Sequence, residues 1–340
     1  MSKRRIIIPI FIPHSGCPHC CVFCNQWKVT GSHNEPTEAF FKKTVESYLS
    51  TAGPEIERVE LAFFGGTFTA IDQELQRKYL SWALPYVTSG SIKSIRISTR
   101  PDYIDQNILT FLKSHYVETV EIGVQSFDRE VLLYSGRGHS MEDSLRACTL
   151  IKKSGMRLGV QLLPGLPGDT IDKSISSAEI TQSLGADDVR IYPAVVLRET
   201  ELERLYLAGK YKPLSLEEAL LWVGQMYEIF HDAKINVIRM GLHPMDFAEG
   251  ECPIVAGPYH VAFGFLVKSR FRRNCMEKIL SQWRKRFPLV KDVRLLIPFE
   301  HKEEYIGHKK ENINYLKEKF FLTKISYEYT HSNEFNVLEF

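Results

Sequence analysis

The residues that could do chemistry gather near the start of the chain, where Cys17, Cys20, Cys21 and Cys24 lie within eight residues. The chain holds seven cysteines in all. An odd number, with four packed so tightly, is a poor framework for disulfides. Thiolates are strong ligands for soft transition metals. The cluster therefore predicts a metal site.

The spacing of these cysteines distinguishes two kinds of metal site. A structural zinc ion needs four ligands on one tetrahedron, and the neighbouring side chains of Cys20 and Cys21 diverge in extended backbone. Cys17, Cys21 and Cys24 alone form the pattern C-x3-C-x2-C, and three thiolates can hold three corners of an iron–sulfur cubane. The remaining iron would then be open to a substrate or cofactor. Zinc stays an alternative, and Cys20 could be a fourth thiol, a redox-sensitive spectator or a tolerated residue.

The elements that must position this loop alternate regularly along the chain. Six apolar runs typical of strands are separated by amphipathic segments typical of helices. The strand candidates cover 6–12, 58–64, 93–98, 118–124, 157–163 and 187–193. The helix candidates cover 36–52, 72–88, 102–114, 139–154 and 170–184. This alternation predicts a parallel sheet, either open and doubly wound or a partial barrel.

Short motifs fall where these strands end. The cysteines follow the first strand, Gly65–Thr67 follows the second, Ser98 ends the third and Gln125 follows the fourth. In both kinds of parallel sheet, ligands bind at the carboxyl ends of the strands. Glycine suits such a place because it has no Cβ and lets a ligand approach the backbone. We therefore expect these motifs to form one site.

The cysteine triad, placed just after the first of six strand–helix units, resembles that of the radical S-adenosylmethionine (SAM) superfamily. The resemblance implies an α/β fold, a partial (β/α)6 TIM-type barrel with a small C-terminal α/β domain. It also implies a [4Fe-4S] cluster held by Cys17, Cys21 and Cys24, with SAM at the open iron. In this superfamily an external electron donor of the flavodoxin or ferredoxin type reduces the cluster, which cleaves SAM reductively to a 5′-deoxyadenosyl radical. The cofactors carry the chemistry, and the protein positions them.

The same resemblance assigns eight further residues to SAM binding. They are Phe23, Gly65, Gly66, Thr67, Ser98, Gln125, Arg137 and Gln161. Two of them depart from the family pattern, because many relatives carry an acid at the position of Ser98 and porphyrin-type relatives carry an aspartate at that of Gln161. A cation at Arg137 would balance the SAM carboxylate. The alternatives are a core position for Phe23 and a surface position for Arg137.

Several motifs resemble the bacterial Elongator-subunit-3-like branch of the superfamily. They are Ile10–His14, Gly65–Thr69, Ile238–Leu242 and Ala256–His260. Full subunit-3 proteins modify the wobble uridine of tRNA and carry an acetyltransferase domain. We expect this chain to lack that domain, because only 73 residues follow position 267. We therefore expect two domains, a radical SAM partial barrel with the cluster loop over 1–245 and a C-terminal extension over 246–340.

The C-terminal segment is basic. Residues 268–340 hold 16 Lys and Arg against 10 Asp and Glu, whereas the net charge of the whole chain is +2. A small βααβ pattern there resembles a KH RNA-binding unit, whose GXXG loop clamps a nucleotide backbone. The loop here is Gly307–Lys310, with Lys310 in place of the second glycine. The resemblance implies RNA, and tRNA in particular, as a partner; an ordinary βααβ cap with solvated charges is the alternative.

These observations predict a cytoplasmic radical SAM enzyme that modifies RNA or tRNA and has no membrane partner. The composition, 44% hydrophobic and 25% charged, excludes wholesale disorder, and no apolar run approaches the roughly 20 residues that span a bilayer. Tyr259 and Cys252 are the catalytic candidates, as donors of a hydrogen atom, with plain packing as the alternative. Two other functions stay open. One is a radical SAM enzyme acting on a tetrapyrrole or another metabolite, and the other is a non-enzymatic iron–sulfur protein that binds RNA or carries electrons.

Overall fold

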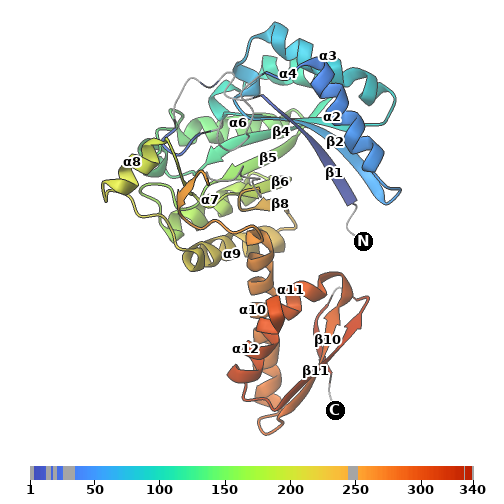
Figure 1. Ribbon diagram of the computed structural model, residues 1–340, viewed down its shortest axis with the longest axis vertical. Coiled ribbons are helices and arrows are strands. Elements are labelled where there is room, and N and C mark those ends of the chain that lie inside the picture. The colour runs from blue at the N-terminus through green and yellow to red at the C-terminus, as the bar shows by residue number, and fades with distance from the viewer. Residues whose placement is uncertain are drawn as a thin grey trace.

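Seven parallel strands form the main sheet of the protein, which the computed structural model shows curling into part of a barrel (Figure 1). The structure describes residues 4–12, 17, 21–25, 35–243, 252–332 and 334–338. In sheet order the strands are β1 (Arg4–Phe11), β2 (Ile56–Phe64), β3 (Ser94–Thr99), β4 (Val117–Gln125), β5 (Arg157–Leu162), β6 (Asp188–Ile191) and β8 (Asn236–Met240). The partial barrel expected from the sequence is therefore confirmed.

The seventh strand is the main departure from the expected topology. Six strands match the predicted apolar runs to within a few residues, but β8 pairs in parallel with β6 at the edge of the sheet. It lies in a segment that shows no clear strand pattern. Its residues are mostly half-buried, and they include the polar Asn236 and Arg239. An edge strand of this kind lacks the continuous apolar run by which the other strands were recognised.

Helices connect the strands. They are α2 (Glu38–Thr51), α3 (Gln73–Thr88), α4 (Gln106–Ser114), α5 (Arg129–Tyr134), α6 (Met141–Lys153), α7 (Ile171–Ser183), α8 (Glu201–Leu207) and α9 (Leu216–Asp232). Each begins after a Ser, Thr or Asp whose side chain accepts a hydrogen bond from an amide of the first turn. Such a cap contributes about 1 kcal/mol. The caps fix where each helix starts and therefore where the preceding loop ends.

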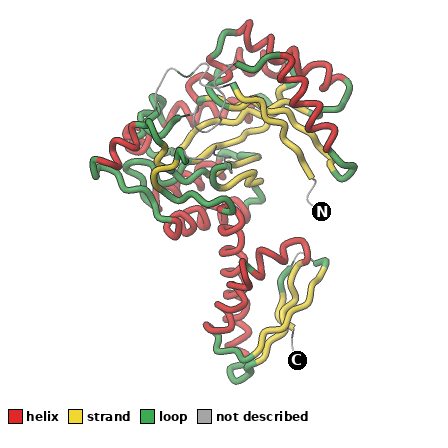
Figure 2. Tube along the Cα trace, in the orientation of Figure 1, coloured by secondary structure: helices red, strands yellow, loops and turns green. Residues whose placement is uncertain are grey.

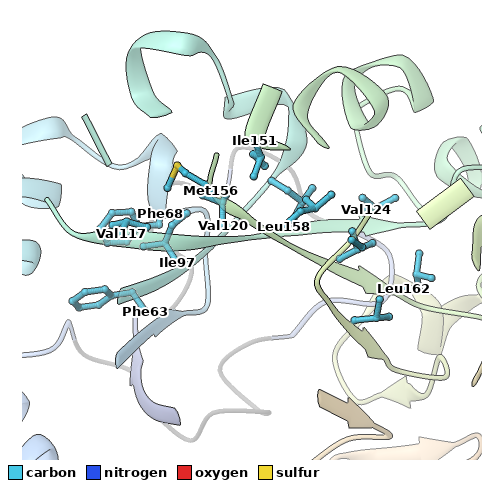
Figure 3. Packing of buried hydrophobic residues seen from close by; sticks show 14 of the residues in the cluster. Phe63, Phe68, Ile97, Val117, Val120, Val124, Ile151, Met156, Leu158 and Leu162 are labelled. Atoms are coloured by element: carbon cyan, nitrogen blue, oxygen red, sulfur yellow. The ribbon is translucent and has the colours of Figure 1, made fainter. Parts of the chain in front are cut away.

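The outer face of the sheet is apolar and packs against these helices. Successive side chains of a strand point to opposite faces, so Val120, Ile122 and Val124 of β4 share the outer face and are fully buried. Figure 3 shows part of this layer, with Val120 and Leu158 near Ile151 of α6. Burial of this layer is the main stabilising contribution to the barrel.

The inner face carries a buried network of charges instead of the branched apolar residues that usually fill such barrels. The guanidinium of Arg96 on β3 lies 3.1 Å from Glu60, 2.9 Å from Glu121 and 2.5 Å from Asp188. These carboxylates come from β2, β4 and β6. Burial alone would raise the pKa of Asp188, but Arg96 and a hydrogen bond from Asn236 hold it far below its usual range. The network therefore joins four strands through ionised groups.

A smaller α/β unit follows the barrel. It contains α10 (Phe263–Arg286), β10 (Asp292–Pro298), α11 (Lys302–Ile306), α12 (Glu311–Lys319), β11 (Lys324–Thr330) and β12 (Asn336–Leu338). The predicted βααβ pattern is present, with β10 between β11 and β12. Helices α10 and α12 cover one face of this sheet (Figures 1 and 2). The long α10 and the short β12 were not expected from the sequence, and the domain boundary at 245/246 stays a prediction.

Helix α10 packs against two separate hydrophobic clusters. Phe263, Val267 and Phe271 in its first half belong to the cluster of the barrel. Leu280 and Trp283 in its second half belong to the cluster of the small sheet. A further pair of antiparallel strands, β7 (Val196–Leu197) and β9 (Ile254–Ala256), lies outside both sheets. In the part of the chain that the structure describes, no helix is long and apolar enough to cross a bilayer.

Candidate functional site

Several of the predicted site residues lie together at the carboxyl ends of strands in the main sheet. Cys21 is buried, and Cys17 and Cys24 are half-buried. The Cys17 Sγ lies 3.3 Å from the Thr67 Oγ1, which places the cysteine loop beside the Gly-Gly-Thr motif that follows β2. The Cys24 amide donates to the Cys21 carbonyl at 3.0 Å and closes a turn between these two cysteines. Cys20 lies outside the described residues.

Arg137 connects the cysteine loop to the sheet. Its Nη1 donates to the Cys21 Sγ at 3.1 Å, and its Nη2 donates to the Gly123 carbonyl of β4 at 2.6 Å. The side chain is buried, so Arg137 does not take the alternative surface position. A guanidinium at this distance would balance the negative charge of a metal-bound thiolate.

Gly123 and Gln125 form a tight corner at the end of β4. A Cβ at Gly123 would lie 2.8 Å from the Gln125 Nε2 and 3.3 Å from the Arg137 Nη2, so only glycine fits there without displacing both. Gln125 has a φ of 69°, which is rare for a residue with a side chain. The ladder to β5 shifts register between Ile122 and Gln125. Such local strain clusters at functional sites.

Two buried oxygens at this end of the sheet have no hydrogen-bond partner among the described residues. They are the Gln125 Oε1 and the Ser98 Oγ. A buried polar atom without a partner costs about 1–3 kcal/mol, so a partner supplied by a ligand would relieve that cost. Gly65 and Gly66, with φ values of 81° and 50°, turn the backbone beside buried Thr67. These residues form a polar cradle at the ends of β2, β3 and β4.

Phe23 packs partly against apolar residues, and its expected contact with SAM stays a prediction. It is half-buried and contacts apolar residues on two sides, including Val131, Ala194 and Val196. Its neighbour Val22 is held on both sides, since its amide donates to the Ser135 carbonyl and its carbonyl accepts from the Leu202 amide. The cysteine loop is therefore anchored by apolar contacts and backbone hydrogen bonds.

His139 is a residue of this region that the sequence reasoning missed. It is buried beside the Val124 backbone. Burial, together with the neighbouring cations Arg137 and Arg100, lowers the pKa of His139 to about 3. The imidazole is therefore neutral at physiological pH. The only feature of the sequence that could have placed His139 at this site is its position two residues after Arg137.

Three predicted residues make their contacts elsewhere in the described ranges. The amide of Gln161 donates to Glu121 in the buried charge network of the inner face. Cys252 is exposed, and its thiol lies 3.7 Å from the Ile254 carbonyl. Tyr259 is half-buried. In the described ranges, neither Cys252 nor Tyr259 forms a hydrogen bond or ion pair with the three cysteines, and their catalytic role stays a prediction.

The donor set fits an iron–sulfur cluster and SAM, although the thiols are not gathered around one point. Within the described ranges, no three His, Cys, Asp or Glu side chains are arranged to hold a metal ion. The three thiols nevertheless share one loop, and the Arg137 guanidinium donates to the Cys21 thiol. The Gln125 and Ser98 oxygens, which have no partner among the described residues, lie at the same end of the sheet. Thiolates are the protein ligands of such clusters. The chemistry of the residues present therefore suits both groups.

Comparison with known families gives matches over most of the chain. Residues 11–178 match the radical SAM superfamily, and residues 186–273 match the radical SAM C-terminal domain. Over 253 residues the chain is 33% identical to a tRNA uridine(34) acetyltransferase of Methanocaldococcus infernus, covering 63% of this chain and 47% of that protein. It is 27% identical to Elongator complex protein 3 of Bos taurus over 271 residues, covering 66% and 49%. The chain thus spans about half the length of these relatives.

A solved structure supports the fold. The archaeal Elp3 of Methanocaldococcus infernus with an N-terminal deletion superposes with a TM-score of 0.65 at 23% identity, covering 81% of this chain and 64% of that one. At this identity the likeness concerns the fold alone. The two family matches, in contrast, cover the strands β2 to β8 and the first part of α10. The chain therefore belongs to the radical SAM superfamily.

Proposed function

We propose that this protein holds a [4Fe-4S] cluster with Cys17, Cys21 and Cys24 and cleaves SAM reductively. The observation that carries the proposal is the contact of Arg137 with both the Cys21 thiol and the Gly123 carbonyl. This contact ties the cysteine loop to the strand end that carries Gln125. When bound, the cluster supplies one electron that breaks a carbon–sulfur bond of SAM and yields a radical able to abstract a hydrogen atom.

The chain's own residues would bind and orient SAM at the cradle. The orphaned Gln125 Oε1 and Ser98 Oγ are hydrogen-bonding atoms for the polar parts of the cofactor. The backbone of Gly65–Thr67 is open to close approach, and Arg137 supplies a positive charge for a carboxylate. Phe23 offers an apolar side to the site. Together these groups suit an amino acid joined to a nucleoside.

For the substrate we propose tRNA. The support is the similarity to the tRNA uridine(34) acetyltransferase of Methanocaldococcus infernus and the surplus of positive charge after residue 267. Lys309 and Lys310 are exposed on the loop before α12, with φ values of 47° and 63°. Arg272, by contrast, is paired with Glu304 at 3.3 Å. We therefore assign the phosphate contacts to the loop, in the manner of a KH unit.

The free cysteines favour a reducing compartment. We accordingly propose that the protein works in the cytoplasm with a flavodoxin or ferredoxin as its electron donor. Tyr259 and Cys252 remain the proposed hydrogen-atom donors.

The test is an anaerobic assay. The protein is reconstituted with iron and sulfide, reduced with dithionite, and incubated with SAM, with or without tRNA from cells that lack the chain. We expect 5′-deoxyadenosine to form and tRNA to increase its rate, less so as salt rises. Cys24→Ala should abolish the product, and Cys275→Ala, far along the chain on α10, should not. An intact cluster without product would overturn the SAM proposal, and a rate indifferent to tRNA would favour a small-molecule substrate.

A further inference from the structure

Gln161 and Arg190 lie side by side on the inner face of the sheet. They are register partners on the parallel strands β5 and β6, so their side chains point to the same face and their backbones are about 4.8 Å apart. Gln161 is half-buried, and Arg190 is 9% exposed. Both lie on the face that also carries Glu121 and Arg96. They are therefore placed in the lumen of the barrel.

Glu121 fixes the orientation of both side chains. The Gln161 Nε2 donates to its carboxylate, and the Arg190 Nε lies 3.1 Å from it. Burial opposes ionisation, but Arg190 and Arg96 outweigh it and lower the pKa of Glu121, which stays a carboxylate. A carboxylate only accepts hydrogen bonds, so the amino group of Gln161 must face it. The Gln161 Oε1 is then left as an acceptor.

The guanidinium of Arg190 also has hydrogen-bond donors that Glu121 does not use. Its Nη1 donates weakly to the Tyr192 hydroxyl at 3.4 Å. Among the described residues no partner is recorded for its Nη2. The guanidinium lies 4.9 Å from the centre of the Phe64 ring on β2. Phe64, Gln161, Arg190 and Tyr192 therefore form a floor across the lumen, and all but Arg190 are half-buried.

We propose that this floor binds the target nucleobase by its Watson–Crick edge. The inference rests on the proposed function, under which that base is a uracil of tRNA. Uracil presents a carbonyl acceptor beside the N3–H donor, which complements the Arg190 donor and the Gln161 acceptor. The guanidinium and the Phe64 ring are flat groups of the kind that contact bases in single-stranded RNA. Gln161, expected from the resemblance to contact SAM, is thereby assigned to the substrate.

The experiment compares two RNA probes on three proteins. The probes are an anticodon stem–loop with uridine at position 34 and the same RNA with N3-methyluridine there, which lacks the N3–H donor. The proteins are wild type, Gln161→Leu, and the matched control Gln182→Leu on the exposed side of α7. Filter binding gives the affinity for RNA, equilibrium dialysis the affinity for SAM, and the anaerobic assay the rate of SAM cleavage.

We expect wild type and Gln182→Leu to bind the uridine probe about tenfold more tightly than the methylated one, the effect of one hydrogen bond. Gln161→Leu should lose this discrimination, and its affinity for SAM, measured by dialysis, is the separate readout that distinguishes the substrate site from the SAM site. Weaker SAM binding by Gln161→Leu would show that Gln161 belongs to the SAM site. If Gln161→Leu still discriminates fully between the two probes, Gln161 does not bind the base and the proposal is wrong. A wild-type protein that cleaves no SAM would overturn the proposed function, while the filter-binding comparison would still decide the inference.

Discussion

At the scale of single residues, Arg137 makes the contacts on which the candidate site depends. Replacing Arg137 with Met removes the positive guanidinium that donates hydrogen bonds to the Cys21 thiol and to the Gly123 carbonyl. A charged hydrogen bond contributes about 1.5–3 kcal/mol, so we expect Arg137→Met to bind SAM roughly 10–100-fold more weakly. Anaerobic equilibrium dialysis of the reconstituted protein measures this.

The control for Arg137 is Arg204→Met, because Arg204 is exposed and, among the described residues, its side chain pairs with Glu201 alone on the surface of α8. Its SAM affinity should equal that of the wild type. If Arg137→Met also binds SAM normally, the guanidinium has no part in the cofactor site.

His139 predicts a pH dependence of stability. Its pKa is about 3 in the folded protein against 6.5 in the unfolded chain, so the unfolded chain takes up the proton first. The stability that depends on the neutral ring is complete above about pH 6.5 and falls on acidification, by up to about 1.4 kcal/mol per pH unit. Urea unfolding of His139→Leu should lose this slope between about pH 6.5 and 5, whereas exposed His308→Leu should keep it. An unchanged slope in His139→Leu would show that the ring is solvated.

At the scale of elements, the charge network determines how the inner strands are joined. Arg96→Met would leave Glu60, Glu121 and Asp188 without their shared cation. Removing one partner of a buried ion pair costs about 3–5 kcal/mol, and we expect the free energy of unfolding to fall by that amount. The surface pair of Arg146 with Asp143 provides the control, since Arg146→Met should change stability by less than about 1 kcal/mol. Equal losses in the two variants would mean that the network is open to water.

The elements also show what the sequence could predict. Six strands and the helices between them followed from apolar runs and cap residues, because both signals are local. The edge strand β8 lacks such a run. The pairing of Arg96 with carboxylates from three other strands depends on the curvature of the sheet, which no local pattern contains. For the same reason the sequence names Gln161 and Arg137 as candidates for SAM binding, a role that stays a prediction, but not the residues that they contact.

At the scale of the whole molecule, α10 joins two hydrophobic clusters. Leu280 is fully buried in the C-terminal cluster, so Leu280→Ala should cost about 2–5 kcal/mol there. Amide hydrogen exchange should then speed up in β10 and β11 and stay slow in β4. Leu158→Ala, in the barrel cluster, should give the opposite pattern. The same loss of protection everywhere would show that the two clusters unfold as one unit.

The central claim is that Cys17, Cys21 and Cys24 hold a cluster with one iron open to SAM. The measurement that tests it most directly is Mössbauer spectroscopy of protein reconstituted with 57Fe, recorded before and after SAM is added. We expect the signal of a four-iron cubane in which one iron alone changes when SAM binds. A spectrum that SAM leaves unchanged, or a protein that takes up zinc in place of iron, would contradict it.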